Sequence, residues 1–283
     1  TETLVFRGEV PVSQHEIMRA PFQEGDFPGP VKYGYLNVGI VEKGPAALIG
    51  RTVFCLYPHQ TAYVVPADAV VVIPDDVPPG RAALAGTVET AVNALWDAAP
   101  LVGDRITVVG AGMVGCCVAG VLARFPGASV EIVDSNPDRE AVASVLGVQF
   151  ALPAEAAKGR DLVFHASASS AGLQLSMELL AAEGTVIELS WYGDREVSLQ
   201  LGGLFHSGRL KIRSSQVGTV SPARSATRSF ADRLALALEL LRDPVFDALI
   251  TGESVFDQLP DVLAEMTAGT NSALCHLITY SGE

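Results

Sequence analysis

Residues 106–115 read ITVVGAGMVG and decide the fold of this 283-residue chain. An apolar run ends here in a G-x-G-x-x-G motif formed by Gly110, Gly112 and Gly115. The first glycine permits a tight turn, the second lets the backbone approach a pyrophosphate, and the third lets helix and strand pack closely. The next apolar run, SVEIVD, ends about 20 residues later at Asp134, whose carboxylate would accept hydrogen bonds from ribose hydroxyls. The stretch predicts a dinucleotide site that prefers NAD, because this carboxylate would repel the 2′-phosphate of NADP.

The sequence around this motif alternates apolar strands with helical patterns, which is typical of a parallel α/β domain. A glycine-rich turn also occurs in α/β proteins that bind other ligands, but here a strand precedes it and a helix follows it. We expect a doubly wound Rossmann sheet over residues 89–219. The predicted strands are RITVVG, SVEIVD, DLVFHAS, GTVIELS and LKIRSS, and the predicted helices lie near 114–124, 137–146, 172–180 and 203–207.

The regions that flank this α/β stretch have a different pattern. Residues 1–88 are rich in Gly, Pro and short β-branched runs, which predict brief strands joined by turns, as in a small β-barrel. Residues 220–283 predict one long helix near 229–241 and a closing strand, LCHLITY. The apolar pattern of that helix, ADRLALALELL, indicates core packing.

Composition restricts the partners and the compartment. The formal net charge of −13 makes nucleic acid and anionic membrane surfaces poor partners. No apolar run reaches the roughly 18 residues that a membrane span needs. The start of the chain, TETLVFRGEV, lacks the pattern of a signal peptide. The four cysteines show no CxxC pair, so we expect reduced thiols in a cytoplasmic protein.

Five stretches, in this order, carry a resemblance to a known family: YGYLNVGIVEKG, QTAYVVPADAVVVIPDD, TAVNAL with VGDRITVVGAGMVG, RLKIRSSQVG and DALITGESVFDQLPDVLAEM. Together they make the chain similar to the medium-chain dehydrogenase/reductase family, whose best-known members are zinc alcohol dehydrogenases. The resemblance implies a GroES-like catalytic domain from residues 1–88 and 220–283, a nucleotide domain over residues 89–219, a small-molecule substrate and a homodimer. Because residues 1–2 match the end of the family's C-G-T-D segment, the catalytic domain is expected to be N-terminally incomplete.

The family's zinc ligands are not found at the matching positions. Catalytic zinc takes three protein ligands from Cys, His or carboxylate side chains. Here the histidine and glutamate of the family's G-H-E segment are Tyr35 and Leu36, and a later cysteine is Gly86. The segment FCLYPHQTAY runs across the place of the lobe that holds structural zinc in the family. We therefore expect no metal, and in particular no zinc.

Without zinc, a hydrogen-bond donor must stabilise the developing oxyanion. Tyr35 is a candidate, because its phenol would project from the vacated ligand position; a tyrosine packed in the barrel is the alternative. His59, on a short loop, could be an acid or base, or could simply be exposed to water. Thr1 matches the family's proton-passing hydroxyl or is merely terminal, and Leu4 replaces the family's relay histidine.

The resemblance also implies contacts around the cofactor. Val114 would lie behind the nicotinamide and Thr90 near it, whereas Arg139 would contact the adenosine end or be a surface residue. His165, which ends a predicted strand, is expected to be structural. The predicted cofactor-binding residues are Gly110, Gly112, Met113, Val114, Gly115, Asp134, Arg139, Thr90, Ser167, Leu189, Ser190, Ser215 and Val217.

Two functions of different class follow. The first is a zinc-independent NAD(P)-dependent oxidoreductase that transfers hydride between nicotinamide and a carbonyl, an alcohol or an activated alkene. The segment YGYLNVG is also similar to a branch that oxidises a hydroxyethyl group on a bacteriochlorophyll precursor, where tyrosine again replaces the zinc histidine. The alternative is a non-catalytic nucleotide-binding or sensing protein, since Leu4, Tyr35, Gly86 and Cys275 each remove a familiar functional group.

Overall fold

The computed structural model describes residues 2–280 and divides the chain into two compact units. The first unit consists of Thr1–Gly86 and Ile250–Glu283, and the second is Thr87–Leu249. Residues 220–249, predicted from the sequence to lie in the C-terminal return to the catalytic domain, are part of the second unit in the structure. The reason is helix α8 (Phe230–Leu240), whose Arg233 is buried against Glu89 of the same unit.

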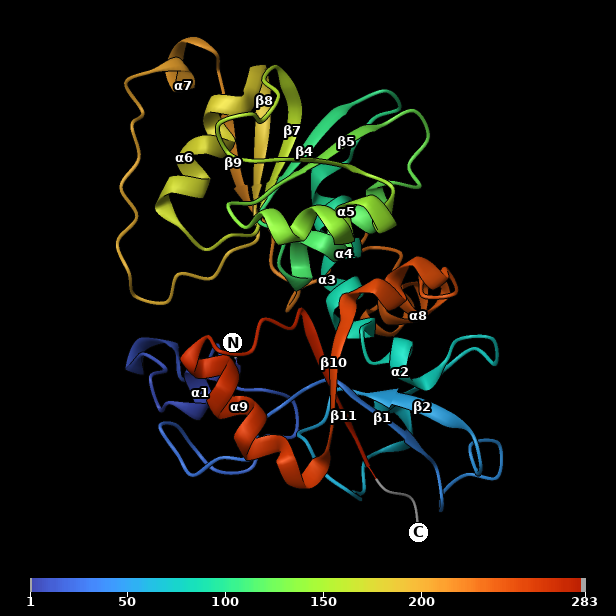
Figure 1. Cartoon of the computed structure of the whole chain (residues 1–283). Coiled ribbons are helices and arrows are strands. Elements are labelled where there is room, and N and C mark those ends of the chain that lie inside the picture. Colours follow the sequence, from blue (N-terminus) through green and yellow to red (C-terminus); the bar gives the residue numbers. More distant parts are fainter. Residues whose placement is uncertain (1, 281–283) are drawn as a thin grey trace. The chain divides into compact units, whose positions relative to one another are not determined.

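The second unit is built on one six-stranded sheet in the order β6-β5-β4-β7-β8-β9 (Figure 1). Every neighbouring pair in this sheet is parallel, as expected for a doubly wound domain. The predicted Rossmann sheet is confirmed. Its strands are β4 (Arg105–Val109), β5 (Ser129–Val133), β6 (Gln149–Ala151), β7 (Arg160–His165), β8 (Leu180–Glu188) and β9 (Lys211–Ser214).

Helices connect these strands, as parallel pairing requires. Helix α4 packs against β4 and β5, and α6 packs against β7 and β8. Of the helices that the structure describes, none is both long and apolar enough to cross a membrane. The helices of this unit are α3 (Ala85–Ala98), α4 (Met113–Leu122), α5 (Glu140–Leu146), α6 (Ser170–Leu179), α7 (Leu204–Ser207) and α8, with 3-10 turns η3 (Pro137–Arg139) and η4 (Pro244–Leu249).

Local sequence explains where the helices begin and end. Helix α6 is capped by Ser169, whose hydroxyl accepts the N–H of Gly172. Helix α8 begins with a capping box between Ser229 and Asp232. Helix α5 ends at Gly147, which takes the left-handed conformation with φ of 78°. These signals lie within a few residues of each helix end, which is why sequence patterns detect them.

Apolar side chains on the central strands form the core of the sheet. Val109, Val133, Val163 and Val186 belong to one buried cluster, which α6 completes with Met177. Strands that are covered on both faces read as continuous apolar runs instead of alternating ones. This is why ITVVG and SVEIV are so hydrophobic.

The first unit is rich in short strands and turns. Its strands β1 (Asn37–Ile40), β2 (Thr52–Cys55) and β3 (Val70–Val72) form an antiparallel sheet, and β10 (Ile250–Val255) pairs in parallel with β11 (Cys275–Thr279). Within residues 2–280 these strands form two sheets instead of one closed barrel. Its helices are α1 (Glu2–Phe6), α2 (Pro79–Ala82) and α9 (Leu259–Ala268), with 3-10 turns η1 (Val12–Gln14), η2 (Ala67–Ala69) and η5 (Phe256–Gln258).

Candidate nucleotide site

The carboxyl ends of the parallel strands bring predicted cofactor residues to one edge of the sheet. Strands β4 and β7 are neighbours, although β5 and β6 lie between them in the sequence, so the chain order reverses there. Ligands of open α/β sheets bind at such a switch point. The residues just beyond the strand ends are Gly110 after β4, Asp134 after β5, Ser167 after β7, Ser190 after β8 and Ser215 after β9.

The glycine turn has the geometry that each of its glycines predicts. Gly110 has a φ of +108°, and a Cβ there would lie 2.8 Å from the backbone nitrogen of Ser167. A Cβ on Gly115 would collide with the carbonyl oxygen of Gly110, so helix α4 can approach β4 only with glycine at this position. Gly112 is exposed, and a Cβ there would have no neighbour within 4 Å. The turn therefore leaves open space over its second glycine, where the motif predicts the approach of a pyrophosphate.

Asp134 holds the glycine turn from the residue after β5, where the ribose contact is predicted. Its Oδ2 accepts the N–H of Ala111 at 2.7 Å, and its Oδ1 accepts the N–H of Asn136 at 2.9 Å. Burial raises the pKa of the nearby Cys116 thiol to about 12. The charge of Arg139 acts to lower this pKa, and the charge of Asp134 acts to raise it. Both charged residues therefore lie near the start of α4, and Arg139 is half-buried there.

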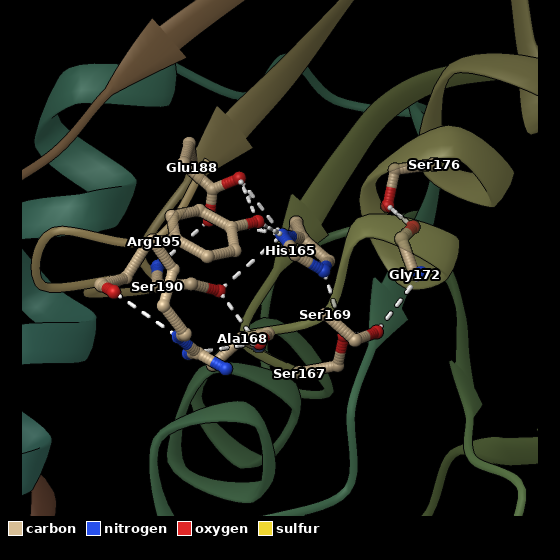
Figure 2. A network of polar contacts seen from close by, with 10 residues as sticks. His165, Ser167, Ala168, Ser169, Gly172, Ser176, Glu188, Ser190 and Arg195 are labelled. Carbon is tan, nitrogen blue, oxygen red and sulfur yellow. Dashed lines mark hydrogen bonds and ion pairs between the residues drawn. The ribbon is translucent and has the colours of Figure 1, made fainter. Parts of the chain in front are cut away.

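A chain of polar contacts follows β7 and β8 (Figure 2). His165 is fully buried, and its Nδ1 lies 2.9 Å from Glu188 Oε1 and 2.8 Å from Glu188 Oε2. Its Nε2 lies 2.7 Å from Ser167 Oγ, which in turn lies 2.9 Å from Ser169 Oγ. The register places His165 directly opposite Glu188 on adjacent strands.

Glu188 accepts further hydrogen bonds from the segment after β8. Its Oε1 accepts the N–H of Ser190 at 2.7 Å, and its Oε2 accepts the hydroxyl of Tyr192 at 3.2 Å. Burial, followed by the charge of Glu188, raises the pKa of Tyr192, so this phenol stays a donor. The Ser190 hydroxyl accepts the N–H of Ala168 at 3.0 Å, which joins the two loops.

The other predicted cofactor contacts of this unit are also partly accessible. Met113 and Val114 are half-buried at the start of α4, and Thr90 is half-buried in α3. Leu189 donates its N–H to the carbonyl of His165 at 2.9 Å. Val217 accepts a hydrogen bond from a buried arginine that the sequence analysis did not single out.

That arginine, Arg233, holds the loop after β9 against α3. Its Nη2 donates to Val217 O at 2.6 Å, and its Nη1 donates to Thr219 O at 3.1 Å and Asn93 Oδ1 at 2.6 Å. Its Nε donates to Glu89 Oε1 at 2.9 Å. The Arg233 clamp is the name used below for these five residues, Arg233, Glu89, Asn93, Val217 and Thr219.

A second carboxylate of α3 holds the beginning of the same loop. Asp97 is 6% exposed, and its Oδ2 accepts the Ser215 hydroxyl at 2.6 Å. Its Oδ1 accepts Arg213 Nη2 at 2.9 Å. The predicted contacts Ser215 and Val217 are thus set by side chains of α3 and α8. The arginine within ADRLALALELL was the available signal for Arg233, but the sequence does not show its partners.

The segment that carries the catalytic candidate Tyr35 lies beside the other candidate, His59, in the first unit. A Cβ on Gly34, the residue before Tyr35, would lie 2.9 Å from His59 Cδ2. The rings of Tyr33 and Tyr35 are 6.1 Å apart in an edge arrangement. His59 Nε2 lies 3.3 Å from Glu2 Oε1, a partner that the sequence analysis did not name. The third candidate, Thr1, lies outside the described residues.

The positions that match zinc ligands carry side chains of another kind. A Cβ on Gly86 would collide with the Leu36 side chain, so these two matched positions are adjacent in the fold. The third, Tyr35, is half-buried. Over residues 2–280, no group of three or more His, Cys, Asp or Glu side chains is placed to hold a metal ion.

Comparisons with known proteins agree with this architecture. No family model matches the chain. Over 118 residues the chain is 36% identical to an L-threonine 3-dehydrogenase of Mesorhizobium japonicum. This aligned segment is 42% of this chain and 34% of that protein. Over 118 residues it is 33% identical to an L-threonine 3-dehydrogenase of Rhizobium rhizogenes. The chain thus spans about a third of the length of the curated relatives it matches.

Solved structures extend the likeness over most of the chain. L-idonate 5-dehydrogenase of Escherichia coli superimposes with a TM-score of 0.71 and 16% identity, covering 85% of this chain and 79% of that one. A short chain alcohol dehydrogenase of Escherichia coli with NADH superimposes with a TM-score of 0.70 and 17% identity, covering 88% of this chain and 83% of that one. An oxidoreductase of Salmonella enterica with NADP superimposes with a TM-score of 0.66 and 17% identity, covering 96% of this chain and 85% of that one. The expected resemblance to the medium-chain alcohol dehydrogenases is confirmed in the fold.

Proposed function

We propose that this chain, which has the fold and the sequence relatives of the medium-chain alcohol dehydrogenases, is a nicotinamide-dependent oxidoreductase for a small-molecule substrate. The observation that carries the proposal is the glycine turn at the switch point, with Gly112 open and Asp134 beside it. When bound, the nicotinamide donates or accepts a hydride. The protein's part is to bind and orient both reactants.

The cofactor is proposed to be NAD. The first turn of α4 would hold the pyrophosphate over Gly112, and Asp134 would accept hydrogen bonds from the adenosine ribose. A carboxylate at this place disfavours a 2′-phosphate by charge repulsion. Val114 and Thr90 would border the nicotinamide, and the loop that carries Ser215 and Val217 would bind its carboxamide.

The reaction is proposed to proceed without zinc. Leu36 and Gly86 offer no metal ligand, and Leu36 fills the space beside Gly86. Tyr35 would then donate a hydrogen bond to the substrate oxygen, and His59, held by Glu2, would exchange the proton. Thr1 remains a candidate from the resemblance alone.

The proposed substrate class is a secondary alcohol or its ketone, with an activated alkene as the other candidate class. The segment YGYLNVG favours the 1-hydroxyethyl group of a bacteriochlorophyll precursor within this class. A panel that contains a 1-hydroxyethyl chlorin, simple secondary alcohols and enones tests this choice. Faster reduction of NAD with the chlorin would support it, and turnover restricted to enones would reject it.

The chain is also proposed to form a homodimer through β9. This strand is at the edge of the sheet, and all four of its residues are exposed. An unpaired edge can add the same strand of a second copy. A monomeric mass in solution would contradict this proposal.

The first test is a titration with NADH and, separately, NADPH, read by energy transfer from Trp96 and Trp191 to the reduced nicotinamide. Saturable binding of NADH that is clearly tighter than that of NADPH is expected. Binding without turnover on the substrate panel would favour the non-catalytic alternative. Binding of neither nucleotide would overturn the proposal.

A further inference from the structure

His165 connects an exposed serine to a carboxylate within the second unit (Figure 2). Its Nε2 lies 2.7 Å from Ser167 Oγ, and its Nδ1 lies 2.8 Å from Glu188 Oε2. A nucleophile beside a base that a third group orients is the arrangement that activates serine for acyl transfer. We propose that Ser167, His165 and Glu188 form a catalytic triad that takes acyl groups from small esters or thioesters. This activity does not require the proposed hydride transfer, although both would use the surface around Ser167.

The hydrogen bonds around Glu188 determine which nitrogen of His165 carries the proton. Glu188 accepts from the N–H of Ser190 and from the hydroxyl of Tyr192, so its carboxylate acts as an acceptor. Its contact with His165 therefore requires a proton on Nδ1. In the neutral ring Nε2 is then unprotonated, and it can accept the proton of Ser167. This is the tautomer that a general base needs.

The hydrogen bonds on the serine side run in the same direction. Ser169 Oγ accepts the N–H of Gly172 at 3.0 Å, which leaves its own proton for Ser167 Oγ at 2.9 Å. Ser167 can then donate to His165, and His165 to Glu188. Each group is a donor to the next one, and such chains strengthen each member. The chain prepares Ser167 to lose its proton toward His165.

The nucleophile is accessible, whereas its base is shielded from water. Ser167 is exposed, His165 is 0% exposed, and the Glu188 side chain is 12% exposed. Ser167 lies between the end of β7 and the start of α6, and the next residue, Ala168, has a φ of +52°. This sharp strand-to-helix turn presents the serine at the carboxyl edge of the sheet. A Cβ on Gly172 would collide with Ser167 Oγ, so a reagent would have to reach this hydroxyl beside the first turn of α6.

The first turn of α6 would supply the donors for a developing oxyanion. Leu173 N–H bonds to Ser169 O, and Gly172 N–H bonds to the Ser169 hydroxyl. The N–H groups of Ser170 and Ala171, by their position in this turn, have no acceptor within the helix. Donors of this kind, at the positive end of a helix, stabilise the negative oxygen of a tetrahedral intermediate.

The proposed reaction has two balanced steps. Ser167 Oγ forms a bond to the acyl carbon while its proton moves to His165 Nε2. The bond to the leaving alkoxide or thiolate then breaks, and His165 gives the proton to that group. In the second step, water attacks the acyl carbon and loses its proton to His165. The bond between that carbon and Ser167 Oγ then breaks, His165 returns the proton to Oγ, and the carboxylic acid leaves. Glu188 stabilises the protonated imidazole and stays charged throughout.

A fluorophosphonate probe tests this triad on the full chain. Such a probe bonds covalently to a serine whose hydroxyl is activated by a base. We expect one probe per chain, at Ser167, as mapped by mass spectrometry of the peptides. Ser167→Ala should abolish the label, and His165→Gln should slow labelling by about 10²–10⁴-fold. Ser144→Ala, which removes an exposed hydroxyl of α5, is the matched control and should label normally.

Glu188→Gln is a second variant, which tests the triad even if the replacement of the buried His165 prevents folding. It keeps a hydrogen-bonding side chain beside Nδ1, and it should slow labelling by about 100-fold or more because the required tautomer is lost. Circular dichroism establishes that each variant is folded. An unlabelled Ser167, or equal labelling rates in the folded wild type, His165→Gln and Glu188→Gln proteins, would overturn the proposal. A protein that labels but does not bind NADH would refute only the proposed function.

Discussion

Arg233 Nε lies 2.9 Å from Glu89 Oε1, and 144 positions separate the two residues in the sequence. Their side chains are only 1% and 6% exposed. The same guanidinium donates to the carbonyls of Val217 and Thr219. One ion pair therefore joins two helices of the second unit and fixes the loop that follows the last strand of the sheet.

Replacing Arg233 with methionine should destabilise the protein by about 3–5 kcal/mol, because Glu89 would remain buried without its partner. Urea unfolding measures this loss. Arg242→Ala is the matched control, since its pair with Glu239 is at the surface, and should cost less than about 1 kcal/mol. The double variant R233M/E89M should be more stable than R233M alone. If R233M and R242A lowered the free energy of unfolding equally, the Arg233 clamp would contribute no more than a surface ion pair.

Gly112→Ala should weaken NADH binding and leave the stability unchanged. A Cβ at this position meets no atom of the protein, but it would project into the space proposed for the pyrophosphate. Gly110→Ala should lower both binding and stability, because the φ of +108° and the backbone at Ser167 exclude a side chain. The Trp-to-NADH titration and a thermal melt measure the two effects. Gly202→Ala, at another open glycine, should change neither quantity.

Asp134→Ala should weaken NADH binding by about 10- to 100-fold, which corresponds to the loss of charged hydrogen bonds. The preference for NADH over NADPH should shrink at the same time, since the repelling carboxylate is gone. Asp138→Asn, at an exposed residue of η3, provides the comparison. If D134A binds both nucleotides as the wild type does, the ribose does not contact this residue.

Thiol reactivity should depend steeply on pH and come from one cysteine. Burial, and then the charge of Glu2, raises the pKa of Cys275 to about 11, so the thiol is neutral at pH 8, with about 0.1% thiolate. Cys275 is half-buried, whereas Cys55, Cys116 and Cys117 are 0% exposed. Ellman's reagent should thus react slowly with the native protein, about tenfold faster for each pH unit from 7 to 10. Cys275→Ser should remove this phase. A pH-independent rate would contradict the raised pKa.

NADH should slow the labelling of Ser167 by the fluorophosphonate. Ser167 is close to Gly110, since a Cβ on that glycine would lie 2.8 Å from Ser167 N. A dinucleotide on the glycine turn would therefore cover the serine. Labelling rates at rising NADH concentrations measure this protection, and Gly112→Ala should reduce it. Full labelling at saturating NADH would place the nucleotide away from Ser167.

The parts of the fold that depend on neighbouring residues were predictable from the sequence. The strand, the turn and the helix around Gly110, Gly112 and Gly115 are encoded within about one turn of helix on either side. Asp134 could be identified because its distance from the motif is set by one helix and one strand. Caps such as Ser229 with Asp232 are likewise local.

The polar networks could not be predicted, because their members are brought together by the sheet. His165 was expected to be structural, since nothing in the sequence shows that the register places it opposite Glu188. Arg233 was hidden in an apolar helix pattern, and its partners Glu89 and Asn93 come from a helix far earlier in the chain. That residues 220–249 belong to the second unit could not be predicted for the same reason, because it depends on these long-range contacts.

The Arg233 clamp also sets an order of events during synthesis. The last strand of the sheet ends at Ser214, so a growing chain can contain every strand of the second unit before Arg233 has been made. Until then the carbonyls of Val217 and Thr219 lack the guanidinium that holds them. Because domains fold as units while the chain emerges, the sheet and this loop should become stable together, only after α8 has been made. A nascent chain stalled just before α8 would contain all six strands but would lack the guanidinium that holds the loop after β9.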